Sequence, residues 1–136
     1  MSHSSKSTDV VLEAAAAASS KKAERIEILD VSSLLVITDH FLICSGNTER
    51  QVRGISDEIE RKLREERGLK PARREGERES RWIVLDFVDF VVHVFHEEER
   101  DYYDLERLWS DAPKVPFEDV WEGTDESAAA EATQAS

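Results

Sequence analysis

The sequence predicts an α/β or α+β domain organised around a mixed β-sheet. The expected elements follow the order helix, strand, strand, helix, strand, strand, strand, helix, which is typical of this fold class. Only the two strands that flank the long helix at 47–68 are placed to be parallel neighbours. At 136 residues, the chain is also long enough to bury the core of a single domain without stabilising disulfides or metal ions.

A helix and then a strand are expected at the start of the domain. Residues 8–22 are rich in alanine, which favours a helix, and Thr8 or Asp9 is a suitable cap. The segment "RIEILDV" (25–31) alternates apolar and charged residues over four positions, so it predicts a strand.

A second strand and the clearest helix follow. The run "LLVITDHFLICSG" (34–46) is rich in branched residues and too short for a well-defined helix, so we interpret it as a strand, with Asp39 as a candidate interruption. Residues 47–68 carry one apolar stripe among charged faces. Thr48 can cap the start of this helix and Gly68 can end it.

Two further strands are expected to pair as a hairpin between residues 82 and 95. Before it, residues 69–76 can form only a short or edge strand, because Pro71 cannot donate a hydrogen bond. A two-residue loop at Phe87-Val88 predicts three facing pairs across the hairpin: Asp86 with Asp89, Val84 with Val91, and Trp82 with His93.

The two faces of this hairpin differ in character. One face is wholly apolar and must be covered by helices; it carries Ile83, Leu85, Phe90, Val92 and Val94. The other is mixed and carries Trp82, Val84, Asp86, Asp89, Val91, His93 and Phe95. A mixed apolar and charged face that contains a tryptophan is typical of a protein-binding surface. A three-residue loop would reverse this assignment of faces.

The chain is expected to end in a helix and a loose tail. Residues 96–111 start with acidic residues, which favours a helix, and Pro113 and Pro116 should end regular structure. The predicted organisation has three parts: a flexible start (1–7), one domain (8–112) and a largely disordered acidic tail (113–136).

Charge and cysteine content limit the possible functions. The net charge is −12, and residues 82–136 hold fifteen acidic and three basic residues, against a balance of +4 in residues 61–81. Binding to nucleic acid is therefore disfavoured, and a basic protein partner is a better electrostatic match; taken alone, however, the charge is more simply explained by solubility. The single Cys44, with no secretory signal or membrane span, predicts a cytoplasmic protein.

Enzymatic chemistry is weakly indicated. Asp86 and Asp89 could act as the carboxylate pair of a nucleotidyltransferase-like enzyme, which is the alternative function. Such an enzyme needs a phosphate-binding loop, yet "SGNTERQV" has one glycine and no lysine at the required place. A polar turn is the simpler interpretation of the two aspartates. We expect a binding module that is not an enzyme and holds no cofactor or metal.

Four blocks in order resemble the ribosomal silencing factor family, also called Iojap or RsfS: "LLVITDHFLICSGNTERQV", "PARREG", "RWIVLDFVDFVVHVFHEEER" and "YYDLERLW". The similarity covers about residues 25–110. Two departures are Asn47, where the family often has serine or threonine, and Val88, where glycine is common at the hairpin tip. Val88 makes a tight type I′ turn less favourable, because that turn needs positive φ angles.

The resemblance implies a mixed five-stranded sheet with helices mainly on one face, similar to nucleotidyltransferases but without their active site. It implies binding to the large ribosomal subunit through ribosomal protein fourteen, which would block joining of the small subunit and silence translation when nutrients are scarce. Some members are homodimers when free. The mixed hairpin face would then be the docking face, with these candidate partner-binding residues: Glu75, Trp82, Asp86, Asp89, His93 and Tyr103.

Overall fold

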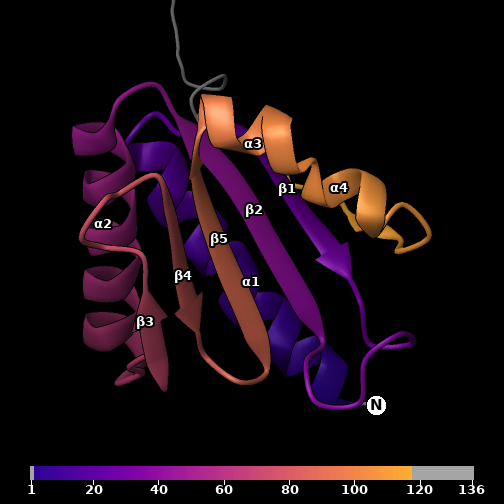
Figure 1. The fold of residues 1–136 in the computed structure, drawn as a ribbon. Coiled ribbons are helices and arrows are strands. Elements are labelled where there is room, and N and C mark those ends of the chain that lie inside the picture. The colour runs from indigo at the N-terminus through magenta and orange to yellow at the C-terminus, as the bar shows by residue number, and fades with distance from the viewer. Residues whose placement is uncertain (1, 118–136) are drawn as a thin grey trace, which may run out of the picture.

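A mixed sheet of six strands organises the protein in a computed structural model that describes residues 2–117 (Figure 1). In chain order, the elements are α1 (Ser2–Ser20), β1 (Glu24–Asp30), β2 (His40–Gly46), α2 (Glu49–Arg67), β3 (Arg73–Glu75), β4 (Trp82–Asp86), β5 (Phe90–His96), α3 (Glu97–Tyr103), α4 (Leu105–Leu108) and β6 (Lys114–Val115). Most of the tail that was expected at 113–136 lies outside the described residues.

The strand order β3-β4-β5-β2-β1-β6 confirms the mixed sheet. The central strands β2 and β5 run parallel, because the chain returns through α2 before it reaches the hairpin, and every other neighbouring pair is antiparallel. The sheet has six strands rather than the five expected. The sixth is β6, which pairs with Ile28 and Leu29 of β1, so the prediction that Pro113 and Pro116 end regular structure is wrong for the two residues between them.

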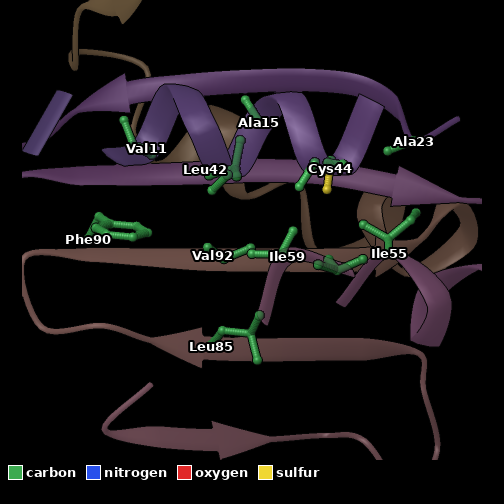
Figure 2. Packing of buried hydrophobic residues seen from close by; sticks show 14 of the residues in the cluster. Val11, Ala15, Ala23, Leu42, Cys44, Ile55, Ile59, Leu85, Phe90 and Val92 are labelled. Atoms are coloured by element: carbon green, nitrogen blue, oxygen red, sulfur yellow. The ribbon is translucent and has the colours of Figure 1, made fainter. Parts of the chain in front are cut away.

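Helices α1 and α2 cover one face of the sheet, as expected for its apolar side (Figures 1 and 2). Four of the five alanines of α1 are buried at this contact, and their small side chains let the helix lie close to the strands. Figure 2 shows side chains of both helices meeting those of β2, β4 and β5 in one core. All five residues predicted for the apolar hairpin face are in this core: Ile83, Leu85, Phe90, Val92 and Val94.

Helix α2 begins and ends with the expected caps. The Thr48 hydroxyl oxygen accepts a hydrogen bond from the Gln51 backbone at 3.1 Å, and the Gln51 side chain in turn accepts one from the Asn47 backbone at 2.8 Å. Gly68 adopts the left-handed conformation, with φ of 65°, and its N–H bonds to the Arg64 carbonyl.

Three boundaries differ from prediction. Helix α1 spans 2–20 rather than 8–22. Strand β2 starts only at His40, because residues 31–39 form turns in which the N–H groups of Leu34 and Leu35 bond to the Val31 carbonyl. The last helix is broken in two at Asp104, whose left-handed backbone (φ of 50°) cannot continue a helix. Within the described residues, no helix is long and apolar enough to cross a membrane.

Candidate functional site

The β4–β5 hairpin keeps the predicted faces but not the predicted pairs. Trp82 faces Phe95, and Val84 faces His93, so the register is shifted by two residues from the expected one. The loop is Val88-Asp89, closed by a hydrogen bond from Phe87 N–H to the Phe90 carbonyl at 3.0 Å. A shift of two residues preserves the alternation of side chains, so the mixed face retains its strand residues.

The unusual turn explains the shifted register. Val88 has a φ of 76°, and the Asp89 N–H bonds to the Phe87 carbonyl at 2.9 Å, which is the hydrogen bond of a γ-turn. The Asp86 carboxylate accepts a hydrogen bond from Val88 N–H at 2.8 Å and so fixes this turn. A sequence argument based on common hairpin loops does not predict a valine in this conformation.

An aromatic cluster occupies the end of the mixed face nearest α3. It consists of Phe41, Trp82, His93, Phe95, Tyr103 and Trp109. The Trp82 ring lies 4.7 Å from Phe95 and 4.8 Å from Tyr103, between centroids, so α3 packs against β4 and β5 here. Trp82 is half-buried and Tyr103 is 51% exposed. The cluster thus presents an edge to solvent while most of its area is covered by the protein itself.

His93 is a buried member of this cluster. Its Nδ1 accepts a hydrogen bond from the Trp82 indole N–H at 3.1 Å, so the neutral ring carries its proton on Nε2. The Nε2 atom is buried without a hydrogen-bond partner. Burial lowers the pKa of His93 to about 4, so the ring is uncharged at neutral pH. His93 therefore orients Trp82 and is not itself an exposed contact residue.

Two of the acidic candidates, Asp86 and Asp89, lie at the end of the hairpin away from the aromatic cluster. Asp86 is half-buried at the hairpin tip, with its second oxygen 4.0 Å from the Arg73 guanidinium, and Asp89 is exposed in the turn. Glu75 is exposed on the edge strand β3, opposite Val84. The structure thus brings together Trp82, His93 and Tyr103, places Asp86 and Asp89 at the other end of the hairpin, and leaves Glu75 across Val84 from His93.

Two features were missed by sequence reasoning. Residues 34–37, interpreted as strand, form a loop that exposes aliphatic side chains; an unbroken apolar run without alternation was the available signal. Arg100 is fully buried, and its guanidinium donates to Glu106 at 2.8 Å and to the Ser45 hydroxyl at 3.3 Å. Nothing in the spacing of charges marked this arginine as buried.

Metal-ligating geometry is confined, among the described residues, to His96, Glu98 and Glu99, whose ligand atoms lie within 4.8 Å of one another. Arg81 already pairs with Glu98 at 2.8 Å and with Glu99 at 2.7 Å, so a cationic side chain occupies this position. Asp86 and Asp89 do not belong to this group. Cys44 is fully buried and burial raises the pKa of its thiol to about 12, which keeps it an unreactive core residue.

Several known proteins resemble the chain over most of its length. The family model described as "Ribosomal silencing factor during starvation" matches residues 4–136. A protein of Halalkalibacterium halodurans named ribosomal silencing factor RsfS is 48% identical over 100 residues, which is 74% of this chain and 85% of that protein. Its namesake in Bacillus subtilis is also 48% identical over 100 residues, covering 74% of this chain and 84% of that protein.

A solved structure agrees with the fold. The crystal structure of a Bacillus halodurans protein superposes with a TM-score of 0.70 at 41% sequence identity, covering 81% of this chain and 99% of that one. The resemblance in the four sequence blocks is thereby confirmed, and the chain belongs to the ribosomal silencing factor family.

Proposed function

We propose that this protein is a ribosome-binding repressor of translation that acts in the cytoplasm under nutrient limitation. It docks on ribosomal protein fourteen of the large subunit and sterically prevents the small subunit from joining. The observation that carries the proposal is membership of the ribosomal silencing factor family, whose model describes a role during starvation. Steric blocking needs a binding surface and no reaction, so the protein needs no cofactor or metal.

The charge distribution supports a protein partner rather than ribosomal RNA. Residues 82–136 carry a net charge of −12, so bare RNA would repel this half of the chain. A basic ribosomal protein offers the opposite charge and can steer the acidic protein to its site. The surface proposed for docking is the mixed face of the hairpin, where Trp82 and Tyr103 present aromatic area and Asp86, Asp89 and Glu75 supply charge at the margin.

The alternative of a nucleotidyltransferase-like enzyme receives little support from these residues. Asp86 is engaged by the Val88 N–H and lies near Arg73, an arrangement that holds a turn together. Two acids in a hairpin tip, with no phosphate-binding loop beside them, are poorly placed to hold magnesium and a nucleotide.

Sedimentation with purified ribosomal subunits tests the proposal. We expect the protein to travel with large subunits on a density gradient, and to shift whole ribosomes toward free subunits at low magnesium. Capture by isolated ribosomal protein fourteen would identify the contact. Binding to small subunits alone would contradict the proposal. Sedimentation velocity of the free protein tests the further expectation, drawn from the family, that it forms a homodimer.

A further inference from the structure

Residues 34–37 form an apolar loop of which only Leu35 packs against the core of the protein. Val36 is 101% exposed, Ile37 is 70% exposed and Leu34 is 47% exposed, relative to full exposure of each residue. Leu35 is half-buried and packs against a second, smaller hydrophobic cluster that includes Val31 and Phe41. The N–H groups of Leu34 and Leu35 donate hydrogen bonds to the Val31 carbonyl at 2.9 and 2.8 Å, and these bonds hold the start of the loop in place.

Two hydrogen bonds connect the end of this loop to the tip of the β4–β5 hairpin. The Thr38 hydroxyl donates to the Val88 carbonyl at 3.2 Å, and the Asp39 N–H donates to the Asp89 carbonyl at 2.7 Å. Both segments lie at the same lower end of the sheet in Figure 1. Val88, 46% exposed, adds a further aliphatic side chain. The resulting surface, called here the apolar edge, comprises Leu34, Val36, Ile37 and Val88.

Acidic residues flank the apolar edge along the chain, while Lys114 of β6, the strand beside β1, pairs with Glu27. The two segments that build it, residues 26–48 and 82–99, contain no lysine or arginine. Their acids on this side of the sheet are Asp30, Asp39, Asp86 and Asp89. Arg73 of the neighbouring strand approaches Asp86 only to 4.0 Å and is itself largely exposed. An aliphatic centre with an acidic margin has a definite electrostatic complement.

We infer that the apolar edge extends the proposed docking face beyond the hairpin tip and that its occupant is a basic protein surface, in which lysines or arginines surround an aliphatic recess. The inference rests on the proposed function, because it assigns this occupant to the large ribosomal subunit. Anionic lipid and nucleic acid are poor occupants, because the acidic margin repels both. A second copy is a poor occupant too, because a two-fold contact would bring the acidic margin against itself.

Substitution of the two most exposed aliphatic residues tests the apolar centre. Val36→Ser with Ile37→Ser removes the apolar area and, because both side chains are exposed, leaves the melting temperature nearly unchanged. We expect the full-length double variant to bind purified large subunits at least tenfold more weakly, as for the loss of an interface hot spot. The matched control is Leu108→Ser, which alters a 73% exposed leucine in α4, outside the apolar edge, and should bind as the wild type does.

A second pair of variants tests the charge. Asp89→Asn removes one negative charge from the margin, and Glu97→Gln removes one from the exposed start of α3 near the opposite end of β5. At low salt, the first variant should bind large subunits severalfold more weakly, the second should bind almost normally, and the difference should disappear at high salt.

The outcomes separate this inference from the proposed function. If the wild type does not bind large subunits, both fail. If the wild type binds and the serine double variant binds equally well, the proposed function stands and the apolar edge is not its contact. If the serine substitutions abolish self-association in sedimentation velocity while binding to large subunits is unchanged, the occupant is a second copy and the inference is overturned.

Discussion

Val88 holds a backbone conformation that a β-branched residue rarely adopts, with a φ of 76° at the hairpin tip. Such strain typically costs 1–3 kcal/mol, and glycine would relieve it at a smaller entropic cost. We expect Val88→Gly to raise the free energy of unfolding by about 1 kcal/mol in urea denaturation. Val88→Ala is the matched control, because alanine removes the branched side chain but keeps the strain. Equal stability of the two variants would refute the role of the backbone.

His93 makes the stability of the protein depend on pH. The ordinary pKa of histidine is 6.5, and burial lowers that of His93 to about 4 in the folded protein. The unfolded chain therefore binds the proton more readily, so stability is intact above pH 6.5 and falls as the pH decreases toward 4. The full loss is on the order of 3 kcal/mol, from the size of the pKa difference. Thermal unfolding measured between pH 7 and 4 should display this decrease.

The control for this pH dependence is His93→Gln, which does not titrate and whose amide oxygen can still accept the Trp82 indole N–H. Most of the slope between pH 6.5 and 4 should disappear in this variant. A smaller slope should remain, because burial also lowers the pKa of His40. If the variant retains the wild-type slope, His93 is not the responsible group.

Helices α3 and α4 are held to the sheet by a buried charge. The Arg100 guanidinium bonds to Glu106 across the break at Asp104, and reaches the Ser45 hydroxyl at 3.3 Å. Because Arg100 is fully buried, removing its partner would leave an uncompensated charge. We expect Glu106→Ala to lower the free energy of unfolding by about 3–5 kcal/mol in denaturant titration.

The exposed ion pair beside it supplies the comparison. Arg25 and Asp101 lie 2.8 Å apart, but their side chains are 49% and 70% exposed. Since surface ion pairs contribute little, Asp101→Ala should cost about 1 kcal/mol or less. Similar losses for the two variants would mean that the Arg100 guanidinium becomes solvated once Glu106 is removed.

At the level of elements, the sequence predicted what depends on periodicity and missed what depends on tertiary pairing. The stripe and caps of α2 and the two faces of the hairpin follow from local patterns, and all are confirmed. Strand β6 lies between two prolines and exists because β1 offers an unpaired edge, which no local pattern reveals. Likewise, the apolar run at 34–37 has the composition of a strand but lies outside the sheet.

For the candidate site, too, the sequence predicted what depends on periodicity and missed what depends on tertiary pairing. The alternation of the hairpin placed Trp82 and His93 on one face, and the structure brings them together through the bond between Trp82 Nε1 and His93 Nδ1. Their exact pairing depended on the turn at Val88, which a rule based on common loops does not capture. The burial of His93 depended on Phe41, which approaches from the neighbouring strand β2, a distant part of the chain.

At the scale of the whole molecule, charge is distributed along the chain in a way that suits steering. Residues 61–81 carry a balance of +4, whereas the two segments that form the apolar edge carry acids alone. A partner of opposite charge is attracted over about one Debye length, which is about 10 Å at 0.1 M salt. In the proposed complex, the long-range field would govern how fast the protein finds its site, and the apolar area would govern how long it stays.

This division predicts how salt affects binding to the large subunit. Between roughly 50 and 300 mM salt, the association rate constant should fall by about tenfold, whereas the dissociation rate constant should change little. Stopped-flow or surface-based kinetics with purified large subunits would measure both constants.

Asp86→Asn with Asp89→Asn should flatten the salt dependence, because each asparagine keeps the shape of the aspartate without its charge. The Leu108→Ser control should keep the wild-type dependence. An association rate that does not change with salt would mean that the contact is wholly apolar and that the acidic margin has no part in binding.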